Sequence, residues 1–270
     1  MAVSRGSVIE VIPVGAPARI RTLLSRSPDG AVPVVHRGRD AIYVEVGGQC
    51  VGVLGRHAVA VPCGLRSREE TLAATGAALV GGVLHLDERP VVIGRIVDVA
   101  VPGLSLRDDG ARAGRWTGDR LDHRTDLRAS RWVEHTIGRG EGLTPYQDDV
   151  WCGWLATHRA AGLATPLVDQ ALRATAHRTT LLSATLLECA MRGEVIPEFA
   201  AYLTALDTPA EAESTARLLR IGHTSGRGML HGARRALTCL RGASALGPTT
   251  PAAVPSPPCP QLEANDQGAA

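Results

Sequence analysis

The sequence predicts an α+β protein, with a β-rich, barrel-like N-terminal domain followed by an α-helical C-terminal domain. Two observations predict this order. About the first hundred residues contain short runs rich in Val and Ile, separated by Gly and Pro, as is typical of strands in a small barrel or sandwich. The second half instead contains Thr-Pro pairs, which are typical of helix starts. Only 3% of residues are aromatic, so Leu, Val, Ala and Ile are expected to build the core.

Changes in composition divide the chain into four segments. We expect the β-rich domain at residues 1–103 and the helical domain at 130–242. Between them, residues 104–129 are rich in Arg, Asp and Gly, which indicates a linker or a long surface loop. Residues 243–270 are rich in Pro, Ala and Ser and lack apolar periodicity, so we expect a disordered tail.

The elements of the N-terminal half follow from short apolar runs. Strands are expected at residues 7–14, 31–36, 41–46, 49–54, 58–61, 78–86 and 91–101. Gly47 and Gly48 can adopt the positive φ of a tight turn, which predicts a hairpin between two of these strands. Residues 67–70, Ser-Arg-Glu-Glu, have the spacing of a capping box and predict one short helix.

Three Thr-Pro pairs predict helix starts in the second half: Thr144-Pro145, Thr165-Pro166 and Thr208-Pro209. Thr is expected to cap the free N–H groups, and Pro suits the first helical position because it lacks an N–H. The first and third pairs also have capping-box spacing. A further helix is expected at residues 180–192, with an apolar stripe formed by Ala184, Leu187, Ala190 and Met191. Gly193 and Gly222 are the expected helix stops.

Charge and composition exclude several classes of function. The net charge of +2 argues against nucleic acid as the main partner. All 29 basic residues are Arg, which excludes a Schiff-base or phosphate-loop lysine, so Arg, backbone N–H groups or hydroxyls must hold any anion. The six cysteines form no C-x-x-C pair, which argues against a zinc ribbon. Neither a signal peptide nor a membrane span is evident, and we expect a cytoplasmic protein with free thiols.

Gly138, Gly140 and Gly142 alternate just before the helix expected at Thr144. Glycine lets backbone N–H groups approach a ligand, and a helix N-terminus adds partial positive charge, so this segment predicts an anion site. Asp148 and Asp149 follow within the first helical turn. They complement the helix dipole, or else they act on a ligand. Gly153, one turn later, allows another backbone or a ligand to approach the same face.

A second polar turn follows the glycine stop at Gly222. Its residues are Gly222, His223, Thr224, Ser225 and Gly226, and Thr224 or Ser225 is positioned to cap a new helix. His223 has either a structural hydrogen-bonding role or a catalytic one. We expect this turn to converge with residues 138–149 in one anion-binding pocket, with Asp148, Asp149 and His223 as the catalytic candidates.

No metal site is expected from spacing alone. His123, His135, Asp148, Asp149 and His223 are scattered, and no H-E-x-x-H motif joins them. We therefore expect no cofactor, although Mg²⁺ at Asp148 and Asp149 remains an option.

Two motifs together resemble the AllH family, a family long described only as a domain of unknown function. The family's G-L-T-P-S-G-D-D motif is matched by residues 142–145 and by Asp148 and Asp149, and its G-H-[ST]-S-G motif is matched by residues 222–226. Residues 179–183, Thr-Thr-Leu-Leu-Ser, resemble the family's Thr/Ser-bearing helix start. The resemblance covers the C-terminal half. The N-terminal half resembles the family mainly in its β-rich character.

The resemblance implies a barrel-like domain followed by a helical domain. It also implies a subunit that acts with AllF (FdrA-like) and AllG in converting oxalurate and phosphate into oxamate and carbamoyl phosphate during allantoin and purine catabolism. The chain departs from the family pattern at Tyr146-Gln147, where the family has Ser-Gly, and at Arg227-Gly228, where the family tends to carry an Asp. It also lacks the Ser-x-Arg-Thr loop of ordinary transcarbamylases.

Three functions remain open at this point. The first is that the chain is a carbamoyltransferase-type subunit that binds a small anion at helix N-termini. Alternatively, it is a non-catalytic assembly subunit or a divergent paralogue, in which the glycines serve packing and the partner chains carry the chemistry. A third reading is a stand-alone phosphate-handling enzyme that uses Mg²⁺ at the paired acids.

Overall fold

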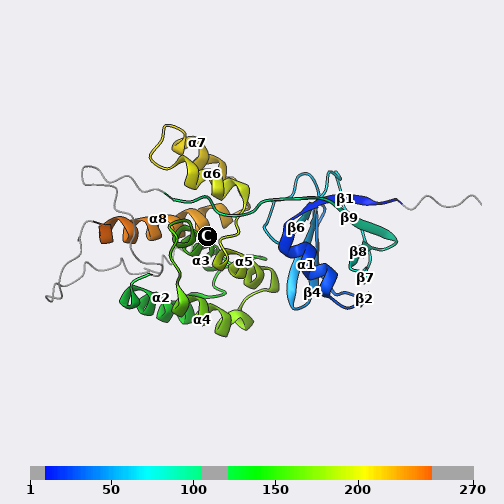
Figure 1. Ribbon diagram of the computed structural model, residues 1–270, viewed down its shortest axis with the longest axis horizontal. Coiled ribbons are helices and arrows are strands. Elements are labelled where there is room, and N and C mark those ends of the chain that lie inside the picture. Colours follow the sequence, from blue (N-terminus) through cyan, green and yellow to red (C-terminus); the bar gives the residue numbers. More distant parts are fainter. Residues whose placement is uncertain (1–9, 105–120, 245–270) are drawn as a thin grey trace, which may run out of the picture.

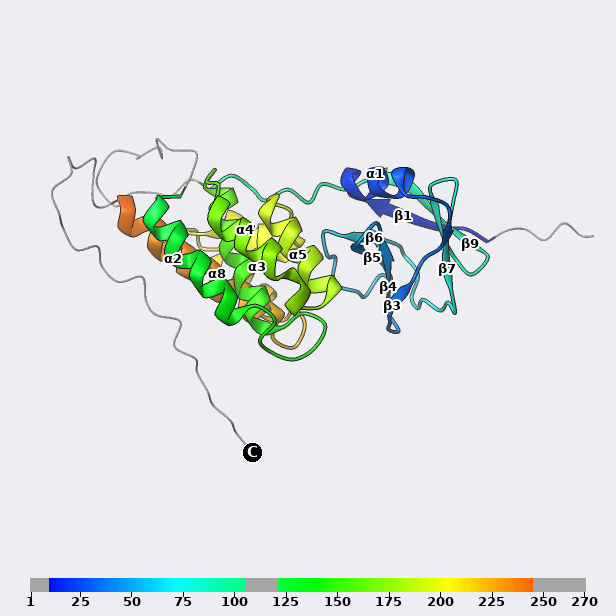
Figure 2. The same cartoon turned by 90° about the horizontal axis from the view of Figure 1, so that it is seen from below.

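The computed structural model describes residues 10–104 and 121–244. It confirms the predicted α+β class. A curled sheet, shaped as a half-barrel, occupies residues 12–96, and helices make up the C-terminal part (Figures 1 and 2). The five cysteines in these ranges form no disulfide with one another.

Nine strands form one sheet within residues 10–104. They are β1 (Ile12–Ala16), β2 (Gly30–Ala31), β3 (Val34–Arg37), β4 (Ala41–Val46), β5 (Gln49–Leu54), β6 (Gly64–Arg66), β7 (Ala77–Val80), β8 (Val83–Leu86) and β9 (Arg89–Ile96). Their order is β2-β7-β8-β9-β1-β6-β5-β4-β3. The central strand, β1, is parallel to β9 and antiparallel to β6. The two hairpin ladders therefore extend to opposite sides of β1.

The hairpin turns follow the glycine pairs. Gly47 and Gly48 have φ of 56° and 73° and join β4 to β5, whose bounds are those predicted. Gly81 and Gly82 have φ of 58° and 75° and divide the predicted segment 78–86 into the β7–β8 hairpin. In both turns glycine adopts the positive φ that most other residues avoid.

Three expectations for this half were wrong. Helix α1 (Ala18–Arg26) was not predicted; it buries Ile20 and Leu24, which are one turn apart. Residues 67–70 form no helix, because the backbone there bonds to other loops: the Arg56 N–H donates to the Glu69 carbonyl at 2.9 Å. Residues 58–61 form a bend and irregular backbone rather than a strand.

The helices of the C-terminal part are α2 (His123–Thr136), α3 (Tyr146–Ala160), α4 (Pro166–Thr175), the 3₁₀ turn η1 (Ala176–Arg178), α5 (Leu181–Met191), α6 (Pro197–Ala205), α7 (Glu211–Leu219) and α8 (Ser225–Ser244). Helix α3 is the central one, with eleven of its fifteen residues buried. Trp151 and Trp154 pack edge to face on it, with ring centroids 5.6 Å apart. The helix predicted at 180–192 and the stop at Gly193 are confirmed.

The Thr-Pro pairs precede helices, but Thr144 and Thr165 do not cap as predicted, whereas the Thr208 hydroxyl accepts the Ala210 N–H at 3.2 Å just before α7. Pro166 does occupy the first turn of α4, yet the Thr165 side chain donates to Asp169 instead of capping. The N-cap of α3 is Pro145, without a side-chain bond, and α7 starts only at Glu211. The Thr144 and Thr165 hydroxyls have other partners in the folded chain, which the local sequence does not indicate.

The segment boundaries also differ from those predicted. Helix α2 starts at His123, inside the expected linker, because the Asp122 side chain accepts from the Thr125 N–H at 3.0 Å and caps it. Helix α8 runs to Ser244, just beyond the expected domain end at 242. The rest of the expected tail, and most of the linker, lie outside the described residues.

The half-barrel and the helices are joined by polar contacts and a shared core. The Arg19 guanidinium donates to both Glu194 carboxylate oxygens at 2.9–3.0 Å and to Gln49 Oε1 at 2.8 Å. The Cys50 N–H donates to Thr185 Oγ1 at 2.8 Å, which fixes β5 against α5. One hydrophobic cluster contains strand residues together with residues of α5 to α8. The two parts are therefore packed as neighbours with a continuous apolar contact.

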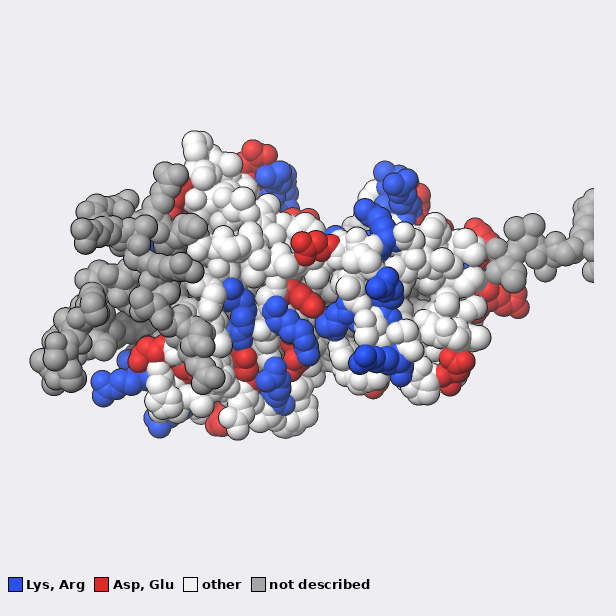
Figure 3. Space-filling view, viewed as in Figure 1, with Lys and Arg blue, Asp and Glu red and all other residues white. Residues whose placement is uncertain are grey.

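Two surface properties bear on function. In the part of the chain that the structure covers, no helix has both the length and the apolar character needed to cross a membrane. On the face shown in Figure 3, Arg side chains are interspersed with Asp and Glu, so this face carries no uniform basic field.

Candidate functional site

The glycine-rich segment before α3 is a tight loop. Gly138, Gly140 and Gly142 have φ of 73°, 121° and 88°, a region that favours glycine. A Cβ on Gly138 would overlap the carbonyl oxygen of Arg178, and a Cβ on Gly140 would lie 2.5 Å from the Tyr146 nitrogen. Gly142 faces open space. The first two glycines therefore let the loop pack between the starts of α3 and α5.

Asp148 ties this loop to α5. It is fully buried, and its Oδ1 accepts the Gly138 N–H at 2.7 Å. Its Oδ2 accepts the hydroxyls of Thr179 and Ser183, the latter at 2.6 Å. Both carboxylate oxygens thus have donors within the chain, and those donors come from two separate segments, the loop and the start of α5.

The loop also covers part of the N-terminus of α3. The Gln147 N–H donates to the Arg139 carbonyl at 3.1 Å, and the N–H groups of Asp148 and Asp149 donate to the Pro145 carbonyl. The expectation that these N–H groups hold an anion is therefore not supported at α3, since the chain's own carbonyl groups accept from them.

The second polar turn lies against the first segment, as predicted. Gly222 has φ of 57°, and α8 starts at Ser225, after His223 and Thr224. The hydroxyls of Thr144 and Ser225 hydrogen-bond to each other at 2.9 Å. His223 is exposed in this turn. The predicted convergence of the two segments is therefore present, with Thr144 and Ser225 at the junction.

Gly226 fixes this turn against the preceding helix. A Cβ at Gly226 would overlap the Leu218 carbonyl oxygen, and the Gly226 N–H donates to the Ile221 carbonyl at 3.0 Å. The role of Gly226 in the structure is close packing of backbone on backbone.

Asp149 lies beside the Thr144–Ser225 junction. It is 4% exposed, and its Oδ2 has no hydrogen-bond partner among the described residues. Burial raises the pKa of Asp149 to about 7, and the charge of Asp148 adds to this, while the Ser225 and Thr144 hydroxyls act to lower it. A carboxyl group with this pKa exchanges its proton near neutral pH.

A close crossing of α3 and α8 holds Asp149 in place. A Cβ at Gly153 would overlap the Met229 carbonyl oxygen, and one at Gly232 would overlap the Val150 carbonyl oxygen. A Cβ at Gly228 would lie 2.7 Å from the Cβ of Asp149. The expectation that Gly153 admits another backbone is confirmed, and that backbone is α8.

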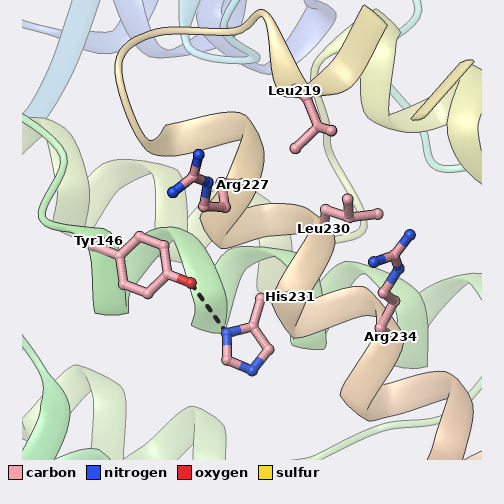
Figure 4. A pocket seen from close by; sticks show the side chains of 6 residues that line it. All are labelled: Tyr146, Leu219, Arg227, Leu230, His231 and Arg234. Carbon is pink, nitrogen blue, oxygen red and sulfur yellow. Dashed lines mark hydrogen bonds between the residues drawn. The ribbon is translucent and has the colours of Figure 1, made fainter. Parts of the chain in front are cut away.

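A hollow of about 320 Å³ opens next to this crossing (Figure 4). Its lining residues are Tyr146, Leu219, Arg227, Leu230, His231 and Arg234. The Tyr146 hydroxyl and His231 Nδ1 are hydrogen-bonded at 3.0 Å. The sequence interpretation did not select these residues, although Arg227, His231 and Arg234 have the i, i+4, i+7 spacing of one helix face.

The paired acids offer little to a metal ion. Within residues 10–104 and 121–244, no group of three or more His, Cys, Asp or Glu side chains is placed to hold one. Both oxygens of Asp148 accept hydrogen bonds, so only Asp149 presents a free oxygen. Mg²⁺ is commonly held by one or two carboxylates together with several waters, so the expectation of Mg²⁺ at this pair stays a prediction that falls mainly on Asp149 Oδ2.

The family comparison agrees with the resemblance seen in the motifs. Residues 136–237 match the sequence model of the family described as oxamate carbamoyltransferase subunit AllH. This range contains all the candidate site residues. No curated protein and no solved structure matches the chain.

Proposed function

We propose that this chain is an AllH-like subunit of an oxamate carbamoyltransferase-type complex. In that reaction, oxalurate and phosphate give oxamate and carbamoyl phosphate, and the partners are AllF (FdrA-like) and AllG-like chains. The family match over residues 136–237 supports the proposal, since it includes both motifs. The single observation that carries a role for this chain in the chemistry is the buried Asp149 with its unpartnered oxygen.

The environment of Asp149 suits a small anionic ligand that contains an amide. Its free Oδ2 accepts an N–H when ionised and donates a proton when neutral. The Thr144 and Ser225 hydroxyls lie beside it, and Ser225 begins α8, whose N-terminus carries partial positive charge. Oxalurate and oxamate carry both an amide and a carboxylate, so they match these two features.

The proposed chemistry assigns one proton transfer to Asp149. A phosphate oxygen attacks the carbamoyl carbon of oxalurate, and the bond from that carbon to the oxamate nitrogen breaks. Neutral Asp149 donates its proton to the leaving nitrogen, and the proton of the attacking hydrogen phosphate restores it. A pKa of about 7 suits both steps at neutral pH. His223 is exposed in the turn after Gly222, and its proposed role is to contact the anionic ligand at the solvent-exposed edge of the Thr144–Ser225–Asp149 junction.

A second function, that of a non-catalytic assembly subunit, is favoured by a specific observation. Asp148 and the glycines at 138, 153 and 232 all have packing or hydrogen-bonding partners within the chain. Packing alone therefore explains these parts of the motif. Asp149 is the exception, because burying a carboxylate oxygen without a partner costs stability and needs another explanation.

Reconstitution of the complex separates these functions. Carbamoyl phosphate formation is measured with AllF- and AllG-like chains, with and without this chain. We expect activity only with it present. Full activity in its absence would overturn the proposal, and activity of this chain alone would favour a stand-alone enzyme. An assembly role is indicated if Asp149→Asn restores full activity and the complex forms.

A further inference from the structure

We propose that the hollow on the side of α8, between Tyr146, Arg227 and Arg234, binds the oxyanion group of a small ligand. This site lies beside the Thr144–Ser225–Asp149 junction but is lined by other residues, and it does not depend on the reaction proposed above. Figure 4 shows Arg227 and Arg234 on either side of Leu230, with Tyr146 of α3 on the side of Arg227 and its hydroxyl directed at His231.

The first support is uncompensated positive charge. In the helical part, Arg159, Arg173, Arg192, Arg217 and Arg241 each pair with a carboxylate. Arg227 and Arg234 form no salt bridge with any described carboxylate, and none of the residues that line the hollow is acidic. A bound oxyanion supplies the missing charge, and the planar guanidinium matches its paired oxygens.

The second support is the construction of the hollow. Leu230 is 4% exposed and forms an apolar floor, and Leu219 closes the side toward α7. The hydrogen bond between Tyr146 and His231 fixes the opposite wall. The volume of about 320 Å³ lies at the lower end of small-ligand sites. The hollow therefore has room for a small ligand.

The third support is the meeting of two helix starts at this hollow. Tyr146 lies in the first turn of α3, and Arg227 lies in the first turn of α8. Although 81 residues apart in the chain, both line this hollow. Arg227 also lies near Tyr146, since its charge acts to lower the tyrosine pKa against the larger effect of burial. The two helix starts therefore contribute a hydroxyl group and a guanidinium group to one hollow.

Arg227 is expected to be the stronger contact. Arg234 also interacts with the Tyr202 hydroxyl and borders a neighbouring hollow that contains Glu211, so part of its charge is balanced. Arg227 is exposed beside Tyr146 and is free of such a neighbour among the residues that line the first hollow.

The test is calorimetric titration of the full chain, in a buffer without oxyanions, with inorganic phosphate and separately with oxamate. We expect binding of at least one probe and a roughly 10- to 100-fold loss of affinity in Arg227→Gln, because hydrogen bonds to charged groups are strong. Arg234→Gln should lose less. Arg128→Gln, an equal charge change on the exposed side of α2, should bind like the wild type.

The outcomes are distinct. Phosphate binding alone assigns the hollow to a phosphoryl group, and oxamate binding alone assigns it to a carboxylate. No binding of either probe to the wild type overturns the inference, as does equal binding by Arg227→Gln and the wild type. If the isolated chain binds a probe but the reconstituted complex is fully active without this chain, the proposed function fails and the anion site in the hollow is retained.

Discussion

At the scale of single residues, Asp148 and Asp149 are neighbours with opposite environments. Sequence analysis identified the pair but assigned both to one site. The structure gives Asp148 donors at both oxygens and leaves Asp149 Oδ2 without one. The sequence could not separate them, because the donors Thr179 and Ser183 follow Asp148 by 31 and 35 positions. Asp149 is nevertheless almost fully buried, at 4% exposed.

Asp148→Ala should destabilise the fold by about 2–5 kcal/mol, since it leaves buried donors without an acceptor. Urea denaturation followed by circular dichroism measures this. The matched control is Glu141→Ala, which removes an acid from the exposed part of the same loop and should change stability by less than about 0.5 kcal/mol. Equal stability of the two variants would show that the hydrogen bonds of Asp148 do not stabilise the fold.

Asp149→Asn should change how stability depends on pH. The folded pKa of about 7 lies above the ordinary value of 3.8, so the folded state holds the proton more tightly. The stability from this group is therefore present below about pH 4 and is lost as pH rises through 7. Each unit of pKa difference corresponds to about 1.4 kcal/mol.

The variant lacks this titration, so its stability relative to the wild type should rise between pH 5 and pH 8. Denaturant midpoints at the two pH values measure the change. Glu141→Gln, which makes the same acid-to-amide change on the surface, should show no such trend. A parallel pH dependence in Asp149→Asn and the wild type would mean that the pKa of Asp149 is not raised.

At the scale of elements, the sequence predicted where helices occur better than how they start. Helix α5 and the β4–β5 hairpin agree with prediction, because local apolar patterns and glycine turns determine them. Two of the three threonines of the Thr-Pro pairs failed as caps, since Thr144 and Thr165 bond to distant or later side chains. The close crossing was half predicted: Gly153 was singled out, but its partner helix required the tertiary structure.

Gly153→Ala should destabilise the protein by about 3 kcal/mol or more, because its methyl group would overlap a backbone carbonyl in α8. Thermal unfolding measures the loss. Gly94→Ala adds the same methyl group where nothing lies within 4 Å, and it should be close to neutral. If Gly153→Ala leaves the melting temperature unchanged, the close packing of α3 on α8 is contradicted.

At the scale of the whole molecule, the order of β then α was predictable, whereas the joint between the two parts was not. Arg19 sits in a helix that the sequence interpretation missed, and its partner Glu194 is 175 residues away. The apolar cluster that spans both parts is likewise formed by residues far apart in the chain. Such long-range contacts leave no periodic signal in one sequence.

Arg19→Ala should lower the free energy of unfolding by about 3–5 kcal/mol, because it leaves the Glu194 carboxylate without its partner at a half-buried interface. Discounting for partial solvent exposure places the value at the lower end. Chemical denaturation measures it, and Arg21→Ala, on the exposed face of the same helix, is the control. A loss no greater than that of Arg21→Ala would show that this contact does not hold the two parts together.

The most direct measurement of the central claim is the rate of carbamoyl phosphate formation by the reconstituted complex containing Asp149→Asn. Proton transfer by a positioned side chain typically contributes about 10²- to 10⁴-fold to rate. We therefore predict a loss of at least about 100-fold, with the complex still assembled on gel filtration. A complex that assembles and turns over at the wild-type rate would contradict the role of Asp149.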